Sequence, residues 1–270
     1  MAGRIVYQRD GAVAHVTLAH PSKFNAISRS MWRELRAVFQ GIAQEPGVRC
    51  VWVQGADGNF CAGGDIAEYP EFRFDPQTLH DFHETEVWGG LQAMLDCDVP
   101  ILAQIEGNCM GAGLEIASCC DLRFAASTAR FGAPIARLGF PMAPREAALV
   151  VSAVGQTTAR AMLLAAAVFD APHMVQHDFL TGVCAADAHR AHCQTVVDTV
   201  LDLSPMAAQA HKRAFRVSNH ALPGEKYTKL ATNSIACQSA PDPLEPYAYA
   251  NHPEHREGIA AFLAKRKPQF

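Results

Sequence analysis

The stretch at residues 99–144, VPILAQIEGNCMGAGLEIASCCDLRFAASTARFGAPIARLGFPMAP, decides the fold. Its apolar run at residues 99–105 has the length of a buried strand, and a glycine-rich turn follows at residues 107–113. The mostly apolar residues 114–120 predict a short buried helix. A strand, a glycine turn and a helix in this order leave backbone N–H groups without intrahelical partners at the helix N-terminus. Such donors, together with the helix dipole, can stabilise a developing negative charge.

A carboxylate, Glu115, lies in the first turn of this predicted helix among apolar neighbours. Burial there would raise its pKa, because desolvation disfavours the charged form. Two interpretations follow from the pattern. Glu115 acts as an acid or base at a site, or it only complements the dipole of its helix.

Local patterns predict alternating strands and helices in the first half of the chain, which implies a mostly parallel or mixed sheet. The expected strands, with Asp10-Gly11 as a hairpin turn, are at residues 5–7, 12–18, 50–55 and 99–105. Ser28 is expected to cap a helix, and another helix is expected over residues 75–95, after a surface loop at residues 69–74. After Gly139 only helices are expected, at residues 144–154, 157–167, 170–179, 187–203, 204–215 and 257–266.

Four blocks of the chain, in this order, resemble the crotonase superfamily, the enoyl-CoA hydratase/isomerase family. They are PSKFNAIS at residues 21–28, NFCAGGDI at residues 59–66, the central stretch at residues 107–139, and EGIAAFLAKRKP at residues 257–268. The resemblance implies an α/β fold, the crotonase-like arrangement of repeated ββα units with a C-terminal helical trimerisation region. It also implies a core at residues 1–200 that binds acyl-CoA thioesters, a helical region at residues 201–270, and a homotrimer or a dimer of trimers.

Reactions of this family pass through a thioester enolate, whose oxygen needs two hydrogen-bond donors. By resemblance these donors are the backbone N–H groups of Gly64 and Ala112. Glu115 matches the first of the two glutamates that family hydratases place around the double bond. The second position is Ile135, which cannot transfer a proton. The usual two-glutamate hydration, and the isomerisation that uses the second carboxylate, therefore lack a group at this position.

A second departure from the family pattern lies at residues 142–146, MAPRE, which replace a glycine-rich segment. Glu146 could supply a displaced acid, or it could stabilise its own helix through the dipole. The pattern favours the second interpretation, although Leu149 and Val150, three and four positions further on, offer Glu146 no local ion pair.

Further residues match family positions that contact the CoA moiety or line the path of the substrate. They are Lys23, Phe24, Ala62, Asp65, Ile66, Ile135, Phe262 and Lys265. Lys265 would contact the CoA phosphates, although the basic residues 265–267 are also typical of a solvated tail. No cofactor is implied apart from the coenzyme A carried by the substrate. The pairs His80/His83 and His189/His192 lack further ligands at suitable spacing and are interpreted as surface pairs, not metal sites.

Composition excludes several other classes. Hydrophobic residues make up 49% of the 270 residues and the formal net charge is −4, so nothing indicates nucleic-acid binding. Nine cysteines without a CxxC pair favour a reducing compartment. The first residues predict a strand and not a targeting segment, and no apolar run is long enough for a membrane span. A cytoplasmic location is therefore expected.

Two functions remain open from the sequence. The first is an acyl-CoA enzyme that uses Gly64, Ala112 and Glu115, by family precedent for hydration or double-bond isomerisation, with decarboxylation, thioester hydrolysis or C–C cleavage as other outcomes of the same enolate. The second is an inactive CoA-thioester-binding protein, which the loss of a glutamate at Ile135 suggests. The retained Glu115 favours the enzyme, because an inactive site has no need of a desolvated carboxylate.

Overall fold

The computed structural model describes residues 2–218 and 249–270. Contacts divide the chain into two compact units, Met1–Asp198 and Thr199–Phe270, and each is described by itself. The trimerisation role of the C-terminal helices and the domain boundary after residue 200 stay predictions. Eight of the nine cysteines are free thiols, and Cys237 lies outside the described residues. No described helix has the length and apolarity that crossing a membrane would require.

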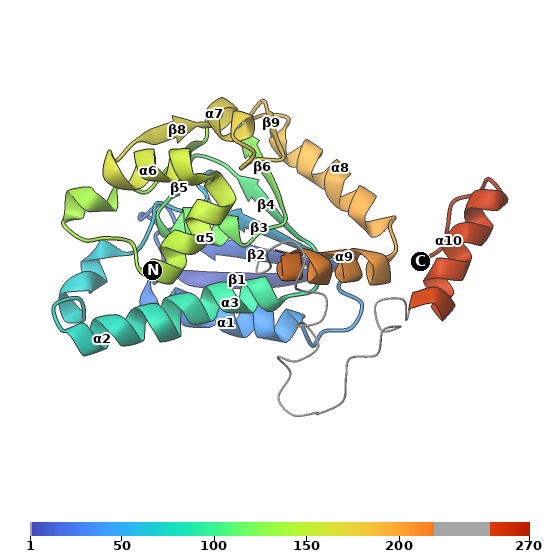
Figure 1. Cartoon of the computed structure of the whole chain (residues 1–270), viewed down its shortest axis with the longest axis horizontal. Coiled ribbons are helices and arrows are strands. Elements are labelled where there is room, and N and C mark those ends of the chain that lie inside the picture. Colours follow the sequence, from blue (N-terminus) through green and yellow to red (C-terminus); the bar gives the residue numbers. More distant parts are fainter. Residues whose placement is uncertain (1, 219–248) are drawn as a thin grey trace. The chain divides into compact units, whose positions relative to one another are not determined.

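The first unit is built on a mixed sheet with the order β1-β2-β3-β4-β6-β9 (Figure 1). β1 and β2 form the predicted antiparallel hairpin, and the following strands pair in parallel. These strands are β1 (Arg4–Asp10), β2 (Val13–Ala19), β3 (Cys50–Gly55), β4 (Ile101–Ile105), β6 (Leu122–Ala126) and β9 (Gly182–Cys184). A second, smaller sheet has β7 between its neighbours and consists of β5 (Asn108–Met110), β7 (Arg130–Gly132) and β8 (Val168–Asp170).

The core of this unit lies between the main sheet and helices α1 (Arg29–Ile42) and α3 (Trp88–Asp96), which pack side by side. Ser28 caps α1 as predicted, because its side-chain oxygen accepts a hydrogen bond from the Met31 N–H. The predicted buried helix is α4 (Ala112–Ser118), whose first six residues are all buried. Its position directly after β5 makes β4, β5 and α4 one ββα unit.

The later helices largely match the prediction, but the expectation of helices alone after Gly139 is wrong, because β8 and β9 also lie in this part of the chain. The helices are α5 (Pro144–Val154), α6 (Gln156–Leu164), α7 (Ala171–Gln176), α8 (His189–Leu201), α9 (Pro205–Ser218) and α10 (Pro253–Leu263). The predicted boundaries of α6 are wrong, because the helix begins at Gln156 and ends at Leu164, and residues 168–170 form β8. The predicted start of α10 is also wrong, because His252 caps it and it begins four residues earlier.

Two corrections concern the segment between the first glycine turn and α3. The first half of the expected surface loop belongs to a 3₁₀ helix, η1 (Ile66–Glu71), and Phe72 after it is buried in the core, whereas residues 72–74 form a turn with Phe74 exposed. The expected single helix is divided into α2 (Pro76–Asp81), a π-helical turn η2 (Phe82–Val87), and α3. A π-helical turn shifts the direction of the side chains that follow it and is frequent at functional sites.

The two glycine turns lie against each other. The Cys61 N–H donates to the Asn108 carbonyl and the Met110 N–H donates to the Cys61 carbonyl, at 2.8 and 2.9 Å. These bonds fix the turn after β3 alongside β5 and the start of α4. Gly113, in the first turn of α4, packs directly on Cys61, since a Cβ atom added at Gly113 would lie 2.8 Å from the Cys61 Cβ and carbonyl oxygen.

We expect Gly113→Ala to destabilise the fold by about 1–3 kcal/mol, because the added methyl group must displace backbone and not a flexible side chain. Urea unfolding would measure the loss. Gly41→Ala in α1 is the matched control, because a Cβ there meets nothing within 4 Å and alanine is the better helix former. Equal stability of the two variants would contradict a tight contact between the turns.

Candidate active site

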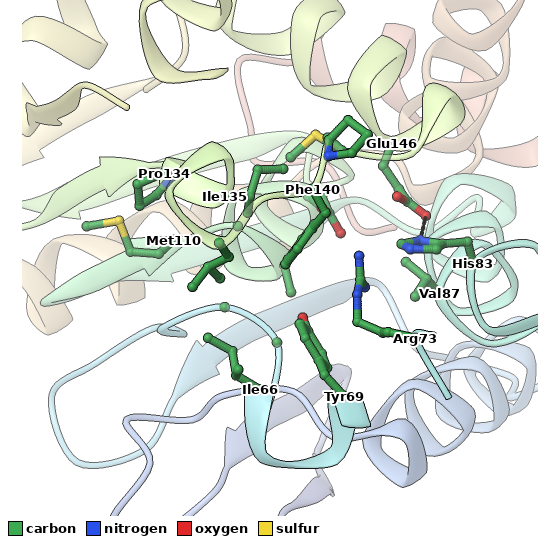
Figure 2. A pocket seen from close by; sticks show the side chains of 18 of the residues that line it. Ile66, Tyr69, Arg73, His83, Val87, Met110, Pro134, Ile135, Phe140 and Glu146 are labelled. Carbon is green, nitrogen blue, oxygen red and sulfur yellow. Dashed lines mark hydrogen bonds and ion pairs between the residues drawn. The ribbon is translucent and has the colours of Figure 1, made fainter. Parts of the chain in front are cut away.

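A cavity of about 390 Å³ opens at the place where the two glycine turns meet. Its walls come from the turn after β3, η1, η2, the start of α4, η3 (Pro134–Leu138) and the first turn of α5 (Figure 2). The lining residues belong to the first unit and are mostly apolar. The charged or titratable ones are Tyr69, Arg73, His83, Glu115, Arg137 and Glu146.

Gly64 and Ala112 both line this cavity, as the sequence predicts. Ala112 is the first residue of α4, where an N–H has no intrahelical acceptor. Neither of the two N–H groups has an acceptor among the described residues. The turns reach this arrangement through Gly63 and Gly111, whose φ angles of 114° and 47° favour glycine. Two adjacent unpaired backbone donors in a cavity can stabilise an oxyanion.

Glu115 projects from α4 into the same cavity and is only 7% exposed. Burial raises its pKa to about 8, and the negative charge of Glu146 contributes to the shift. At neutral pH Glu115 is therefore mostly protonated. A protonated carboxyl group beside two N–H donors is suited to deliver a proton to a carbanion or enolate.

Glu146 also faces the cavity, from the first turn of α5, and is 2% exposed. Nδ1 of His83 lies 3.0 Å from its Oε1 atom, so His83 donates a hydrogen bond to the carboxylate (Figure 2). A glutamate that served only the helix dipole would need neither the burial nor this partner. The position at the helix start is as predicted, but the environment is that of a site carboxylate.

The interpretation of both histidine pairs as surface pairs is wrong for one member of each. The His83 side chain is 18% exposed and belongs to the cavity, because the π-helical turn directs it toward α5. His189 is fully buried and bonds the Phe124 carbonyl and Glu106. His80 lies at the surface as predicted.

Ile135 lies on η3 and contributes to the apolar wall of the cavity, with Met110, Pro134 and Phe140 (Figure 2). The position of Ile135 relative to the second family glutamate stays a prediction. Glu146 faces the same cavity from another wall, on α5. Four charged or titratable residues of the cavity were missed by sequence reasoning, namely Tyr69, Arg73, His83 and Arg137. No motif marks them.

The residues expected along the CoA path fall into two groups. Ala62 and Ile66 line the cavity. Lys23 and Asp65 form an ion pair of 2.7 Å, in which Asp65 also caps η1, and Phe24 near them is exposed. This ion pair holds the loop that contains Lys23 beside the first glycine turn.

Phe262 and Lys265 belong to the second unit, whereas the cavity is lined by residues of the first. Phe262 is 82% exposed on α10, and Lys265 follows the end of this helix. Their contact with CoA remains a prediction.

The raised pKa of Glu115 makes stability depend on pH. Between its ordinary value of 4.5 and about 8, the folded chain keeps a proton on Glu115 that the unfolded chain releases. The free energy of unfolding therefore falls as pH rises through this window, by about 1.4 kcal/mol per pH unit from this group. We expect Glu115→Gln to gain stability relative to wild type over the same window.

Urea unfolding of both proteins at several pH values would measure this difference. Glu84→Gln is the control, because Glu84 is exposed and pairs with Arg145 outside the cavity wall. A stability difference between Glu115→Gln and wild type that does not change with pH would show that Glu115 does not hold its proton.

Comparison with known proteins places this site in a family. A family model described as enoyl-CoA hydratase/isomerase matches residues 8–270. A probable enoyl-CoA hydratase of Mycobacterium bovis is 28% identical over 266 residues, which are 98% of this chain and 97% of that protein. The 2,3-dehydroadipyl-CoA hydratase of Escherichia coli is 27% identical and covers 98% of both chains.

A solved structure agrees with these relatives. The crystal structure of an enoyl-CoA hydratase/carnithine racemase from Magnetospirillum magneticum has a TM-score of 0.88 and 30% identity, over 98% of this chain and 94% of that one. The predicted α/β class is confirmed, and the arrangement of strands and helices is that of crotonase-fold proteins. The chain therefore belongs to the enoyl-CoA hydratase/isomerase family, within the crotonase superfamily.

Proposed function

We propose that this protein is an acyl-CoA enzyme that works through a thioester enolate, with enoyl-CoA hydration or double-bond isomerisation as its reaction. One observation carries the proposal. A single cavity brings together two unpaired backbone N–H groups, at Gly64 and Ala112, and a buried carboxyl group, Glu115, whose pKa is raised to about 8. The names of the relatives support the same reaction class.

In the proposed reaction the thioester oxygen accepts hydrogen bonds from the N–H groups of Gly64 and Ala112. Negative charge develops on this oxygen as the enolate forms, and each such donor contributes on the order of 3 kcal/mol in other enzymes. Glu115, protonated at neutral pH, donates its proton to the α-carbon as the enolate collapses. No metal or cofactor takes part, and coenzyme A enters only with the substrate.

Hydration also needs a base for the attacking water, and Glu146 is suited to that role. Its carboxylate faces the cavity and is oriented by His83 at 3.0 Å. Water that gives its proton to Glu146 can add to the β-carbon, while Glu115 protonates the α-carbon. In isomerisation the same two groups would move a proton between two carbons. Glu146 on α5 thus takes the place of the family glutamate that is Ile135 here.

Other outcomes of the same enolate, namely decarboxylation, thioester hydrolysis and C–C cleavage, use the same oxyanion donors. An inactive CoA-binding protein is the alternative of a different class. The two buried carboxylates favour an enzyme, because burying them is unfavourable and a pure binding site gains nothing from it. Incubation with several acyl-CoAs in deuterium oxide separates these cases. Exchange at the α-carbon of any thioester supports the enolate, whatever the net reaction. If thioesters bind but none of them exchanges, the result supports the inactive protein.

We expect both Glu115→Gln and Glu146→Gln to lower the hydration of a reactive enoyl-CoA by roughly 10²–10⁴-fold, because each removes a positioned proton donor or acceptor. The loss should lie in kcat, since glutamine keeps the shape of the cavity. The decrease in absorbance of the enoyl thioester measures the rate. Glu84→Gln should retain wild-type activity, since Glu84 pairs with Arg145 and does not line the cavity. A harmless Glu146→Gln would restrict Glu146 to a role in its helix.

We also propose the family's assembly, a trimer or a dimer of trimers. Large apolar side chains are exposed on each unit, with Leu164 82% exposed in the first and Phe262 82% and Leu263 75% exposed in the second. Such side chains are commonly covered in oligomers. Light scattering at micromolar concentration is expected to give a mass three or six times that of the chain, and a monomer would contradict the proposal.

A further inference from the structure

Arg73 is a cavity residue that the proposed reaction does not use. It follows the buried Phe72, and its side chain points from the η1 side toward the space between Phe140 and Glu146 (Figure 2). Its Cζ atom lies 3.8 Å from the centroid of the Phe140 ring and 4.6 Å from that of Tyr69. Among residues 2–218 and 249–270, its guanidinium has no hydrogen-bond or ion-pair partner.

Contacts with the rings of Phe140 and Tyr69 hold the Arg73 side chain in place, but they do not account for a cation at this position. Cation–π contacts hold a guanidinium, yet they provide no oxygen acceptor for its five N–H donors. Burial lowers the pKa of Arg73, because an apolar cavity disfavours its charge, but the group remains charged at neutral pH. Because no described residue accepts from these N–H groups and the side chain lines the cavity, an anionic ligand can bond them without breaking an existing contact.

The other charges of the cavity leave room for an anion. Glu115 is mostly neutral. Glu146 accepts a hydrogen bond from His83 and is not bonded to Arg73, although its negative charge favours the Arg73 cation. Arg137, the second arginine of the lining, is exposed and points its Nη2 toward the Ala166 carbonyl at 3.5 Å. Of the two arginines that line the cavity, Arg73 is therefore the one available to a group beside Phe140.

We propose that Arg73 binds a carboxylate at the far end of the acyl group, so that the substrate is the CoA thioester of a dicarboxylic acid. A guanidinium accepts a carboxylate in a bidentate, charge-assisted pair, for which lysine is a poorer substitute. The thioester end would lie between Gly64 and Ala112, and the rest of the acyl chain would pass the apolar wall. This inference rests on the proposed function and names its substrate class.

The test is calorimetric binding of saturated thioesters, which measures recognition without turnover. Glutaryl-CoA is compared with valeryl-CoA and adipyl-CoA with hexanoyl-CoA, since each pair has the same number of acyl carbons. Wild type should bind at least one dicarboxylic thioester about tenfold or more tightly than its neutral partner. Arg73→Met should abolish the preference and leave binding of the neutral thioesters nearly unchanged, which also shows that the variant is folded. Arg73→Lys should keep part of it.

Arg145→Met is the matched control, because Arg145 also stacks on an aromatic ring, that of Trp88, but pairs with Glu84 outside the cavity lining. It should keep the full preference. No preference in wild type, or a preference that survives Arg73→Met, overturns the role of Arg73 and leaves the proposed function intact. Failure of all four thioesters to bind overturns both.

Discussion

The hydrogen bonds between Cys61 and β5 are the interaction on which the site depends. They join two segments that follow different strands, and they are backbone bonds, so they fix position and direction together. Gly63 and Gly111 then lie close enough that a Cβ added at Gly111 would contact the Gly63 Cα at 3.7 Å. The two N–H donors face one cavity only because these turns touch. The thiol of Cys61 is an inert part of this contact, since burial raises its pKa to about 12.

A second constraint is that two carboxyl groups share one apolar cavity. Both cannot be charged without a large electrostatic cost, so the proton that remains belongs to the pair. The surroundings of Glu115 and Glu146 differ enough to determine which of the two carries the proton. Glu146 accepts a hydrogen bond from His83, whereas Glu115 is one of the buried residues of α4. Glu115 therefore holds the proton, and in the proposed reaction the roles of acid and base follow from the different surroundings of two identical side chains.

The sequence predicts those parts of the site that are local in the chain. Gly64, Ala112 and Glu115 each lie within a short motif whose strand, turn and helix form as expected. The His83–Glu146 contact joins residues 63 positions apart and depends on a π-helical turn, for which hydrophobic periodicity has no signal. Residues 69–74 resemble a loop in composition, and only burial of Phe72 in the core turns Tyr69 and Arg73 toward the cavity.

Ile135 matches the position at which the family pattern has a second glutamate, and its effect on the cavity depends on Glu115 and Glu146. An isoleucine on η3 makes that wall of the cavity apolar, and burial in this mostly apolar cavity raises the pKa of Glu115. A carboxylate on α5 would then approach the substrate from a different wall than one on η3. In the proposed reaction the attacking water is held on the side of η2, where His83 orients Glu146. We interpret Ile135 and Glu146 together, because a further ionised side chain on η3 would add to the repulsion between the carboxyl groups of Glu115 and Glu146.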